Sequence, residues 1–376
     1  MLFLNNDRQV LEAAMPGLDE KLAACDPGSL ETPAGQGLAL FQSAGGVRLL
    51  APTNCGGFGA SAAQAVAVQR AVGSRSGSLA VATTMHHFSM ASLVALGNNG
   101  TGLEWILIEA VATGDRLLAS GFAEGKPGAG ILSPTMRAVD TPDGLLVSGV
   151  KKPCSLAHSM TMLTASVALP GPDGRDQLAV VLIPADTPGV RTEPFWVSPA
   201  LAGAESDAVI VEEVLVPNEL VVRTQMTPGD QLDDVHRTGF LWFELLMTAS
   251  YTGIAAGLLE RALSGSRASA EAMLRIAAPI DMVASSLDHL AAELDAGKCD
   301  DALLTRALLT RFAAQDLLTS SAAAAVEALG GMAFIGSDEL ATTLASVHCL
   351  AFHPPSRGRS AAAVIESLRG APLAFD

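Results

Sequence analysis

Aromatic residues are scarce in this chain of 376 residues: 12 Phe, three Trp and one Tyr make up 4% of the sequence. This composition disfavours an aromatic-rich β-sandwich. Lys and Arg are also few, 23 against 39 Asp and Glu, and the formal net charge is −16. Phosphate backbones are bound by clustered Lys and Arg, so we expect no nucleic-acid partner and no anionic membrane surface as a partner.

Several common signatures are missing as well. The five cysteines are widely spaced without a CxxC pair, which predicts free thiols and no metal site. No run of 18 uninterrupted apolar residues occurs, and the N-terminus lacks the basic start of a signal peptide, so we expect a soluble, cytoplasmic protein. Without GxSxG, HExxH, GxxxxGKS or GxGxxG in a supporting context, hydrolase, zinc-protease and P-loop functions lack their minimum residues.

What the chain does contain is a block of strand patterns from about Arg116 to Arg223. Turn sequences such as Asp140–Gly144 and Gly171–Gly174 separate apolar, β-branched segments. The expected strands lie at 117–122, 145–150, 161–169, 178–183 and 208–211. We therefore predict a middle β-domain over residues 116–224.

Helical spacing of apolar residues dominates on both sides of this block. The expected helices are 5–26 (divided at Pro16), 61–72, 78–97, 102–113, 230–265, 274–296 and 301–329. Long helices joined by short connections are typical of an antiparallel bundle. The predicted domains are an N-terminal helical domain (1–115), the β-domain (116–224) and a C-terminal helical bundle (225–376).

Two adjacent histidines, His86 and His87, stand on one of the expected helices. Neighbours on a helix point about 100° apart, so they cannot both ligate one metal as an i, i+4 pair would. We expect one of them to pack in the core and the other to be solvated.

Five motifs, in order, resemble those of the acyl-CoA dehydrogenase family over nearly the whole chain. They are Leu49-Leu50-Ala51-Pro52 with Gly56-Gly57-Phe58-Gly59, Phe122-Ala123-Glu124 with Pro127-Gly128-Ala129-Gly130, Gly149-Val150-Lys151-Lys152-Pro153-Cys154-Ser155, Val211 to Pro217, and Leu329-Gly330-Gly331-Met332-Ala333-Phe334. The resemblance implies an α+β fold with an N-terminal helical domain, a β-barrel-like middle domain and a C-terminal antiparallel four-helix bundle. It also implies a flavin between the β-domain and the bundle.

The same resemblance assigns cofactor residues. Phe122, Ala123 and Gly128 correspond to the flavin-facing strand and loop, and Ser155 corresponds to the hydroxyl residue near flavin N5. The residues alone also allow Ser155 to be an ordinary strand hydroxyl. The cofactor implied is FAD, with FMN possible because the family's arginine followed by Phe-Gly has no match between 266 and 276.

Gly330 and Gly331 correspond to a loop that approaches the cofactor of a neighbouring subunit. The resemblance thus implies a homodimer or homotetramer. A plain helix C-cap is the alternative for this Gly-Gly pair.

Acyl thioester dehydrogenation, the family's usual reaction, needs a carboxylate base. The family's C-terminal Glu has no match in residues 351–356. Some members supply the base from the first bundle helix, and Glu244 lies near that place, nine residues before Gly253. Its neighbours Trp242 and Phe243 would raise its pKa towards the range of a base. An exposed or salt-bridged glutamate is the alternative.

The Phe352-His353-Pro354-Pro355 stretch resembles flavin-dependent monooxygenases of the same fold. His353 would then assist proton transfer, or else cap the turn before the two prolines. The leading expectation is α,β-dehydrogenation of a CoA- or carrier-protein-bound acyl thioester, with an electron-transfer or reductase partner. The alternatives are a monooxygenase that uses reduced flavin and oxygen, and a catalytically silent homologue acting as a subunit.

Overall fold

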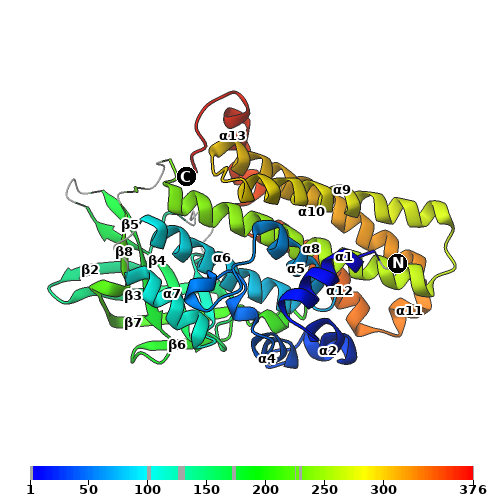
Figure 1. The fold of residues 1–376 in the computed structure, drawn as a ribbon, viewed down its shortest axis with the longest axis horizontal. Coiled ribbons are helices and arrows are strands. Elements are labelled where there is room, and N and C mark those ends of the chain that lie inside the picture. The colour runs from blue at the N-terminus through cyan, green and yellow to red at the C-terminus, as the bar shows by residue number, and fades with distance from the viewer. Residues whose placement is uncertain are drawn as a thin grey trace.

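The computed structural model describes residues 3–99, 103–125, 132–171, 175–224, 226–227 and 231–375. Along its longest axis, a layer of strands lies at one end, and helices fill the middle and the other end (Figure 1). The predicted α+β class, with helices on both sides of a middle sheet, is confirmed.

The N-terminal region is helical. Its helices are α1 (Asn5–Ala14), α2 (Leu18–Ala24), α3 (Pro27–Leu30), α4 (Gln36–Ser43), α5 (Ala62–Gly73), α6 (Gly77–Asn99) and α7 (Leu103–Thr113), with 3-10 turns η1 (Gly46–Arg48) and η2 (Thr53–Cys55). The predicted break at Pro16 is present between α1 and α2. Helix α5 begins with a capping box in which Ser61 and Gln64 bond each other's backbone amides.

The described strands form one eight-stranded sheet. They are β1 (Leu118–Gly121), β2 (Arg137–Thr141), β3 (Gly144–Cys154), β4 (Met162–Pro170), β5 (Asp176–Pro184), β6 (Val190–Glu193), β7 (Asp207–Pro217) and β8 (Val221–Arg223). The strand order is β6-β7-β3-β2-β4-β5-β8, and β1 pairs in parallel with β4. The turns η3 (Ala202–Ala204) and η4 (Asn218–Leu220) flank β7. The three strands that the sequence did not predict, β2, β6 and β8, have five residues or fewer, and Ala138 is the one buried residue among them. The exact domain boundaries stay a prediction.

The C-terminal region is built on three long helices: α8 (Asp234–Gly265), α9 (Ala270–Asp295) and α10 (Asp301–Leu329). Shorter elements follow: α11 (Gly331–Ile335), α12 (Asp338–His348), η5 (Cys349–Phe352) and α13 (Arg357–Leu368). Helix α8 packs on α9, α10 and α12 on one side and on α5 and α6 on the other, so it joins the bundle to the N-terminal helices.

Two glycines set how closely α5 and α8 cross. A Cβ at Gly253 would lie 2.2 Å from the carbonyl oxygen of Arg70, and one at Gly73 would lie 2.3 Å from that of Ser250. Real atoms do not approach so closely, so even alanine at either position would force the helices apart.

Helix α6 is long and apolar enough by composition to cross a membrane over Gly77–Asn98, but 72% of its most apolar window is buried inside the protein. It is therefore a core helix. The expectation that one of His86 and His87 is solvated is wrong, because both are fully buried. His86 bonds the Val47 carbonyl through Nε2 and accepts the Leu118 amide at Nδ1, which links α6 to β1. Burial keeps the pKa of both imidazoles below the ordinary value, to about 4 for His86.

Candidate functional site

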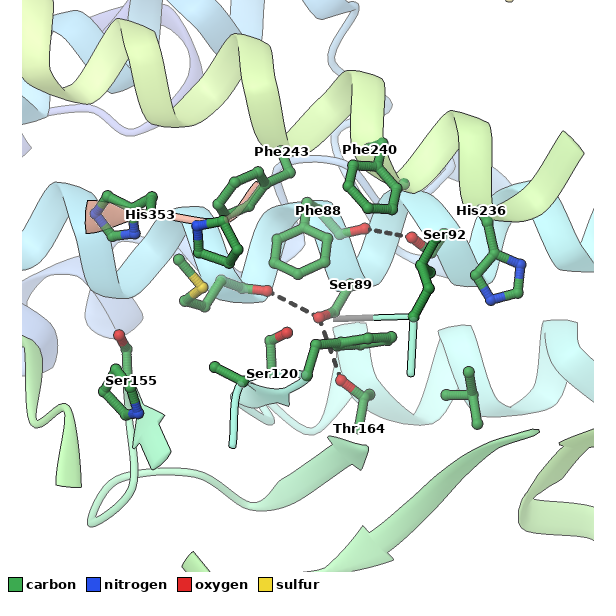
Figure 2. A pocket seen from close by; sticks show the side chains of 18 of the residues that line it. Phe88, Ser89, Ser92, Ser120, Ser155, Thr164, His236, Phe240, Phe243 and His353 are labelled. Atoms are coloured by element: carbon green, nitrogen blue, oxygen red, sulfur yellow. Dashed lines mark hydrogen bonds between the residues drawn. The ribbon is translucent and has the colours of Figure 1, made fainter. Parts of the chain in front are cut away.

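A cavity of about 740 Å³ lies between the sheet and the helices α6 and α8, with the segment 349–354 at one end. Figure 2 shows α8 on one side of it and the strands on the other, with side chains from both converging on the space between them. This volume falls within the range of small-molecule and cofactor pockets.

The α8 wall of the cavity is one helical stripe. His236, Gly239, Phe240 and Phe243 line it, at the three- and four-residue spacing that places side chains on one helix face. Phe243 packs edge to face on Phe88 of α6, with ring centroids 5.3 Å apart. This face is therefore apolar over most of its length.

A set of hydroxyl groups also borders the cavity, on α6 and β4. Ser92 and Ser89 of α6 donate to the carbonyls of Phe88 (2.9 Å) and Met85 (2.8 Å), and Thr164 of β4 donates to the Ala119 carbonyl (3.0 Å). Ser89 Oγ and Thr164 Oγ1 also lie 3.4 Å apart. With their hydrogens directed at carbonyls, these hydroxyl oxygens retain lone pairs that can accept a hydrogen bond. Figure 2 shows Ser89, Ser120 and Thr164 grouped below the phenylalanine rings.

At one end of the cavity Ser155 faces His353. Ser155 Oγ lies 3.0 Å from Ser206 Oγ, and both residues are buried. His353 Nε2 lies 2.8 Å from the hydroxyl of Tyr251, a fully buried residue of α8. Burial, with a smaller effect of the Arg311 charge, lowers the pKa of His353 to about 3, and burial raises the pKa of Tyr251 well above its usual value. His353 is therefore neutral at physiological pH, and the ring nitrogen that carries its hydrogen decides whether Tyr251 or His353 is the donor in this bond.

The opposite end of the cavity carries His236, Asp233 and Arg223. His236 Nδ1 lies 2.7 Å from Asp233 Oδ1, which also accepts the backbone N–H of His236 as the N-cap of α8. Burial would raise the pKa of Asp233, but its bonds with His236 lower it. The Asp233 and Arg223 side chains are 41% and 43% exposed, so this end meets solvent.

Glu124 also lines the cavity, held by a dense set of partners. Lys151 Nζ lies 2.8 Å away, and the backbone amides of Thr135 and Met136 donate to the same carboxylate. Burial alone would raise the pKa of Glu124, but the bonds from Lys151 and Thr135 outweigh it and lower the pKa to about 2. Glu124 is thus a fixed anion, and its bonds to Thr135 and Met136 hold the residues that lead into β2.

Glu244, the predicted base, does not line the cavity. It stands one residue beyond Phe243, so it points about 100° away from the cavity stripe. Its carboxylate bonds Arg311 Nε of α10 at 2.5 Å, and both side chains are fully buried. Burial raises the pKa of Glu244 to about 7, against the opposing effect of Arg311. Nothing tests its catalytic assignment directly, which stays a prediction.

The predicted cofactor residues fall in three places. Phe122, Ala123 and Ser155 line the cavity, and Gly128 lies outside the described residues. Gly330 and Gly331 are at the far end of the molecule from the sheet, beside α11 in Figure 1. Their assignment to a neighbouring subunit's cofactor stays a prediction.

Sequence reasoning missed Tyr251 and the Asp233–His236 pair. The signal for the pair was present, since Asp233 precedes a helix and His236 follows at the N-cap spacing. Tyr251, the one tyrosine, is separated from His353 by 102 residues, and no local pattern joins them.

Comparison with known proteins identifies the family. No protein-family model matches the chain. This chain is 40% identical over 376 residues to the isobutylamine N-hydroxylase of Streptomyces viridifaciens. The alignment covers 99% of this chain and 100% of the N-hydroxylase. The chain belongs to the acyl-CoA dehydrogenase-like flavoprotein oxidoreductases. The predicted family is thereby confirmed.

Solved structures share the fold of this flavoprotein. KijD3 in complex with FMN and dTDP-3-amino-2,3,6-trideoxy-4-keto-3-methyl-D-glucose superposes with a TM-score of 0.82 at 18% identity, over 97% of this chain and 94% of that one. The FAD complex of PigA superposes with a TM-score of 0.80 at 15% identity, over 97% and 98% of the two chains.

The cavity suits the flavin that this family uses. A flavin ring is flat and largely apolar, with polar atoms along its edges. The cavity offers an apolar surface at Phe240 and Phe243. It offers polar hydroxyl groups at Ser155 and Ser206.

Proposed function

We propose that this flavoprotein is a monooxygenase that hydroxylates the nitrogen of a small primary alkylamine. The support from comparison is the full-length similarity to an isobutylamine N-hydroxylase. The support from the site is the row of hydroxyl oxygens at Ser89, Ser92 and Thr164, whose hydrogens bond backbone carbonyls. Such acceptors suit the N–H donors of a neutral amine, and the phenylalanines of the cavity suit a short alkyl chain.

The carboxylates favour this reaction over dehydrogenation of an acyl thioester. Removal of an α-proton requires an available carboxylate or similar base beside the substrate. Of the described acids that line the cavity, Glu124 is bound to Lys151 and Asp233 to His236. Glu244 points into the bundle instead. Amine hydroxylation has no need of a carbon-acid base, because the nitrogen lone pair is itself the nucleophile.

We assign flavin binding to the end of the cavity with Ser155, Phe122 and Ala123. When bound and reduced, the flavin supplies two electrons to dioxygen, so that one oxygen atom reaches the amine nitrogen and the other leaves as water. The balance is R–NH₂, O₂ and reduced flavin in, and R–NHOH, H₂O and oxidised flavin out. A separate reductase would provide the reduced flavin, as FAD or FMN. Acyl thioester partners and a homodimer or homotetramer stay predictions.

His353 is the group of this chain best placed to handle a proton at that end. We assign the Tyr251 hydroxyl as the donor to Nε2, which would place the ring hydrogen on Nδ1. A neutral imidazole in this setting holds its hydrogen firmly and serves as a donor to an oxygen nearby. Its ring is fixed by Phe243 and Tyr251, so the donor does not reorient during turnover.

The experiment is a single-turnover comparison. Flavin-loaded protein is reduced anaerobically and mixed with isobutylamine and oxygen, and the products are identified by mass spectrometry; N-hydroxylamine is expected. Oxidised protein is mixed anaerobically with acyl thioesters in parallel. Loss of the flavin absorbance there, without added reductant, would support dehydrogenation instead. A preparation that binds no flavin would support the silent subunit.

A further inference from the structure

The Asp233–His236 pair has the geometry of a proton acceptor at the solvent end of the cavity. Asp233 Oδ1 accepts from Nδ1, so in the neutral ring the hydrogen sits on Nδ1 and Nε2 carries the lone pair. Within the described part of the chain, no hydrogen-bond partner of Nε2 is found. The His236 side chain is 8% exposed and extends from α8 towards the strands (Figure 2).

The charged side chains near His236 that the structure describes are held by ion-pair partners of their own. Arg223 on β8 is held by Asp140 at 2.6 Å, and Arg237 on α8 turns away to Asp234 and Asp301. The nearest α6 group in the cavity, Ser92, is an uncharged hydroxyl. Among the described residues, Asp233 is the acid that bonds the His236 ring directly.

The interior beyond this pair is unsuited to a cation. His236 and Phe243 are seven residues apart, which is about 10 Å along α8. Over that length the helix presents Phe240 and Phe243, and burial of an unpaired charge there would cost several kcal/mol. A primary alkylamine, with a pKa like the ~10.4 of lysine, arrives in neutral solution as an ammonium ion.

We propose that the Asp233–His236 pair is the entry site where an alkylammonium substrate docks and leaves its proton. This inference rests on the proposed function. One N–H bond of the ammonium breaks, its electron pair stays on nitrogen, and the proton forms a bond to Nε2. The resulting imidazolium stays beside the Asp233 carboxylate, and the neutral amine moves along the apolar wall to the hydroxyls of Ser89 and Thr164.

The first test compares two amines in the variant His236→Gln. For isobutylamine, kcat/KM falls about 100-fold at neutral pH, in line with the loss of a general base. For a fluorinated analogue that is already neutral at this pH, the loss is less than about threefold. The control is His289→Gln on α9, a 58% exposed side chain far from the cavity, which changes neither value. Equal losses for both amines, or no loss for either, overturn the inference.

The second test counts protons without turnover. Calorimetry of isobutylamine binding to the oxidised, flavin-loaded protein in two buffers of different ionisation enthalpy gives the protons released. Wild type releases none, because His236 keeps the proton; His236→Gln releases about one. Asp233→Asn, which keeps an N-cap, weakens binding about tenfold and serves if the first variant is unstable. One proton released by wild type refutes the inference alone, whereas failure to bind any alkylamine refutes the proposed function as well.

Discussion

Arg311 of α10 bonds Glu244 of α8 through Nε, and with its other two nitrogens it bonds the carbonyl oxygens of His353 and Pro355 at 2.9 and 2.5 Å. One guanidinium therefore fixes both the buried carboxylate and the loop that brings His353 to the cavity. Between Phe352 and Arg357 the loop is neither helix nor strand, so the bonds from Arg311 hold it in place.

The first prediction concerns this ion pair. Arg311→Met leaves the Glu244 carboxylate buried without its cation, and we expect the free energy of unfolding to fall by about 3–5 kcal/mol. Thermal or urea unfolding measures the change. The matched control is Arg357→Met, which removes an exposed pair with Asp316 and is expected to cost about 0–1 kcal/mol. Equal stability of the two variants would contradict this role.

Glu244→Gln separates structure from catalysis. If Glu244 acts only in packing, the variant loses stability yet retains amine hydroxylation within a few-fold at a temperature where it is folded. A base for proton abstraction would instead lose about 10²–10⁴-fold in rate when made neutral. Turnover normalised to folded, flavin-loaded protein is the measurement, and a loss of that size would restore the catalytic assignment.

We expect the fall in the free energy of unfolding at low pH to depend on Glu124. Its folded-state pKa, about 2, lies below the ordinary 4.5, so its ionised form stabilises the fold above pH 4.5 and this stability is lost as the pH falls towards 2. The shift corresponds to about 3 kcal/mol. Unfolding measured from pH 7 to 2.5 should show a shallower acid decline in Glu124→Gln than in wild type. If the unfolding free energy of Glu124→Gln fell with pH as steeply as that of wild type, other carboxylates would be responsible for the loss of stability at low pH.

Tyr251→Phe tests the orientation of His353. Removal of the hydroxyl leaves Nε2 without its donor and frees the ring to rotate or change tautomer. We expect kcat for hydroxylation to fall about tenfold with KM nearly unchanged, since the neutral donor is misplaced in the transition state alone. A change confined to KM would indicate a binding role for the pair.

Ser155→Ala probes the flavin end of the cavity. Loss of one hydroxyl hydrogen bond is worth about 0.5–1.5 kcal/mol, so the flavin dissociation constant should rise about tenfold at most. Fluorescence titration with FMN and with FAD measures it and shows which flavin binds more tightly. Ser286→Ala on the exposed face of α9 is the control. Equal affinities in the two variants would remove Ser155 from the flavin site.

The helices were predictable because their apolar periodicity spans many residues. The strands β1, β3, β4, β5 and β7 were predictable because each contains an apolar or β-branched segment bounded by turn residues. The short strands β2, β6 and β8 were not, because pairing with longer neighbours holds them more than their own side chains do. Ser155 was found through a local motif. Glu244 lies on a helix that the sequence predicted, but a difference of one residue in spacing rotates a side chain by about 100°, so sequence spacing could not show whether it faces the cavity. The partner of His353 lies too far along the chain for any local signal.

The crossing of α5 and α8 at Gly73 and Gly253 has a consequence for substrate range. Gly253 lies ten residues from Phe243, about 15 Å along α8, so main-chain contact outside the cavity sets how closely this helix approaches α5. Under the proposed function, we therefore expect the range of amines to depend on individual rings such as Phe240 and Phe243, which line the cavity, and not on the spacing of α5 and α8.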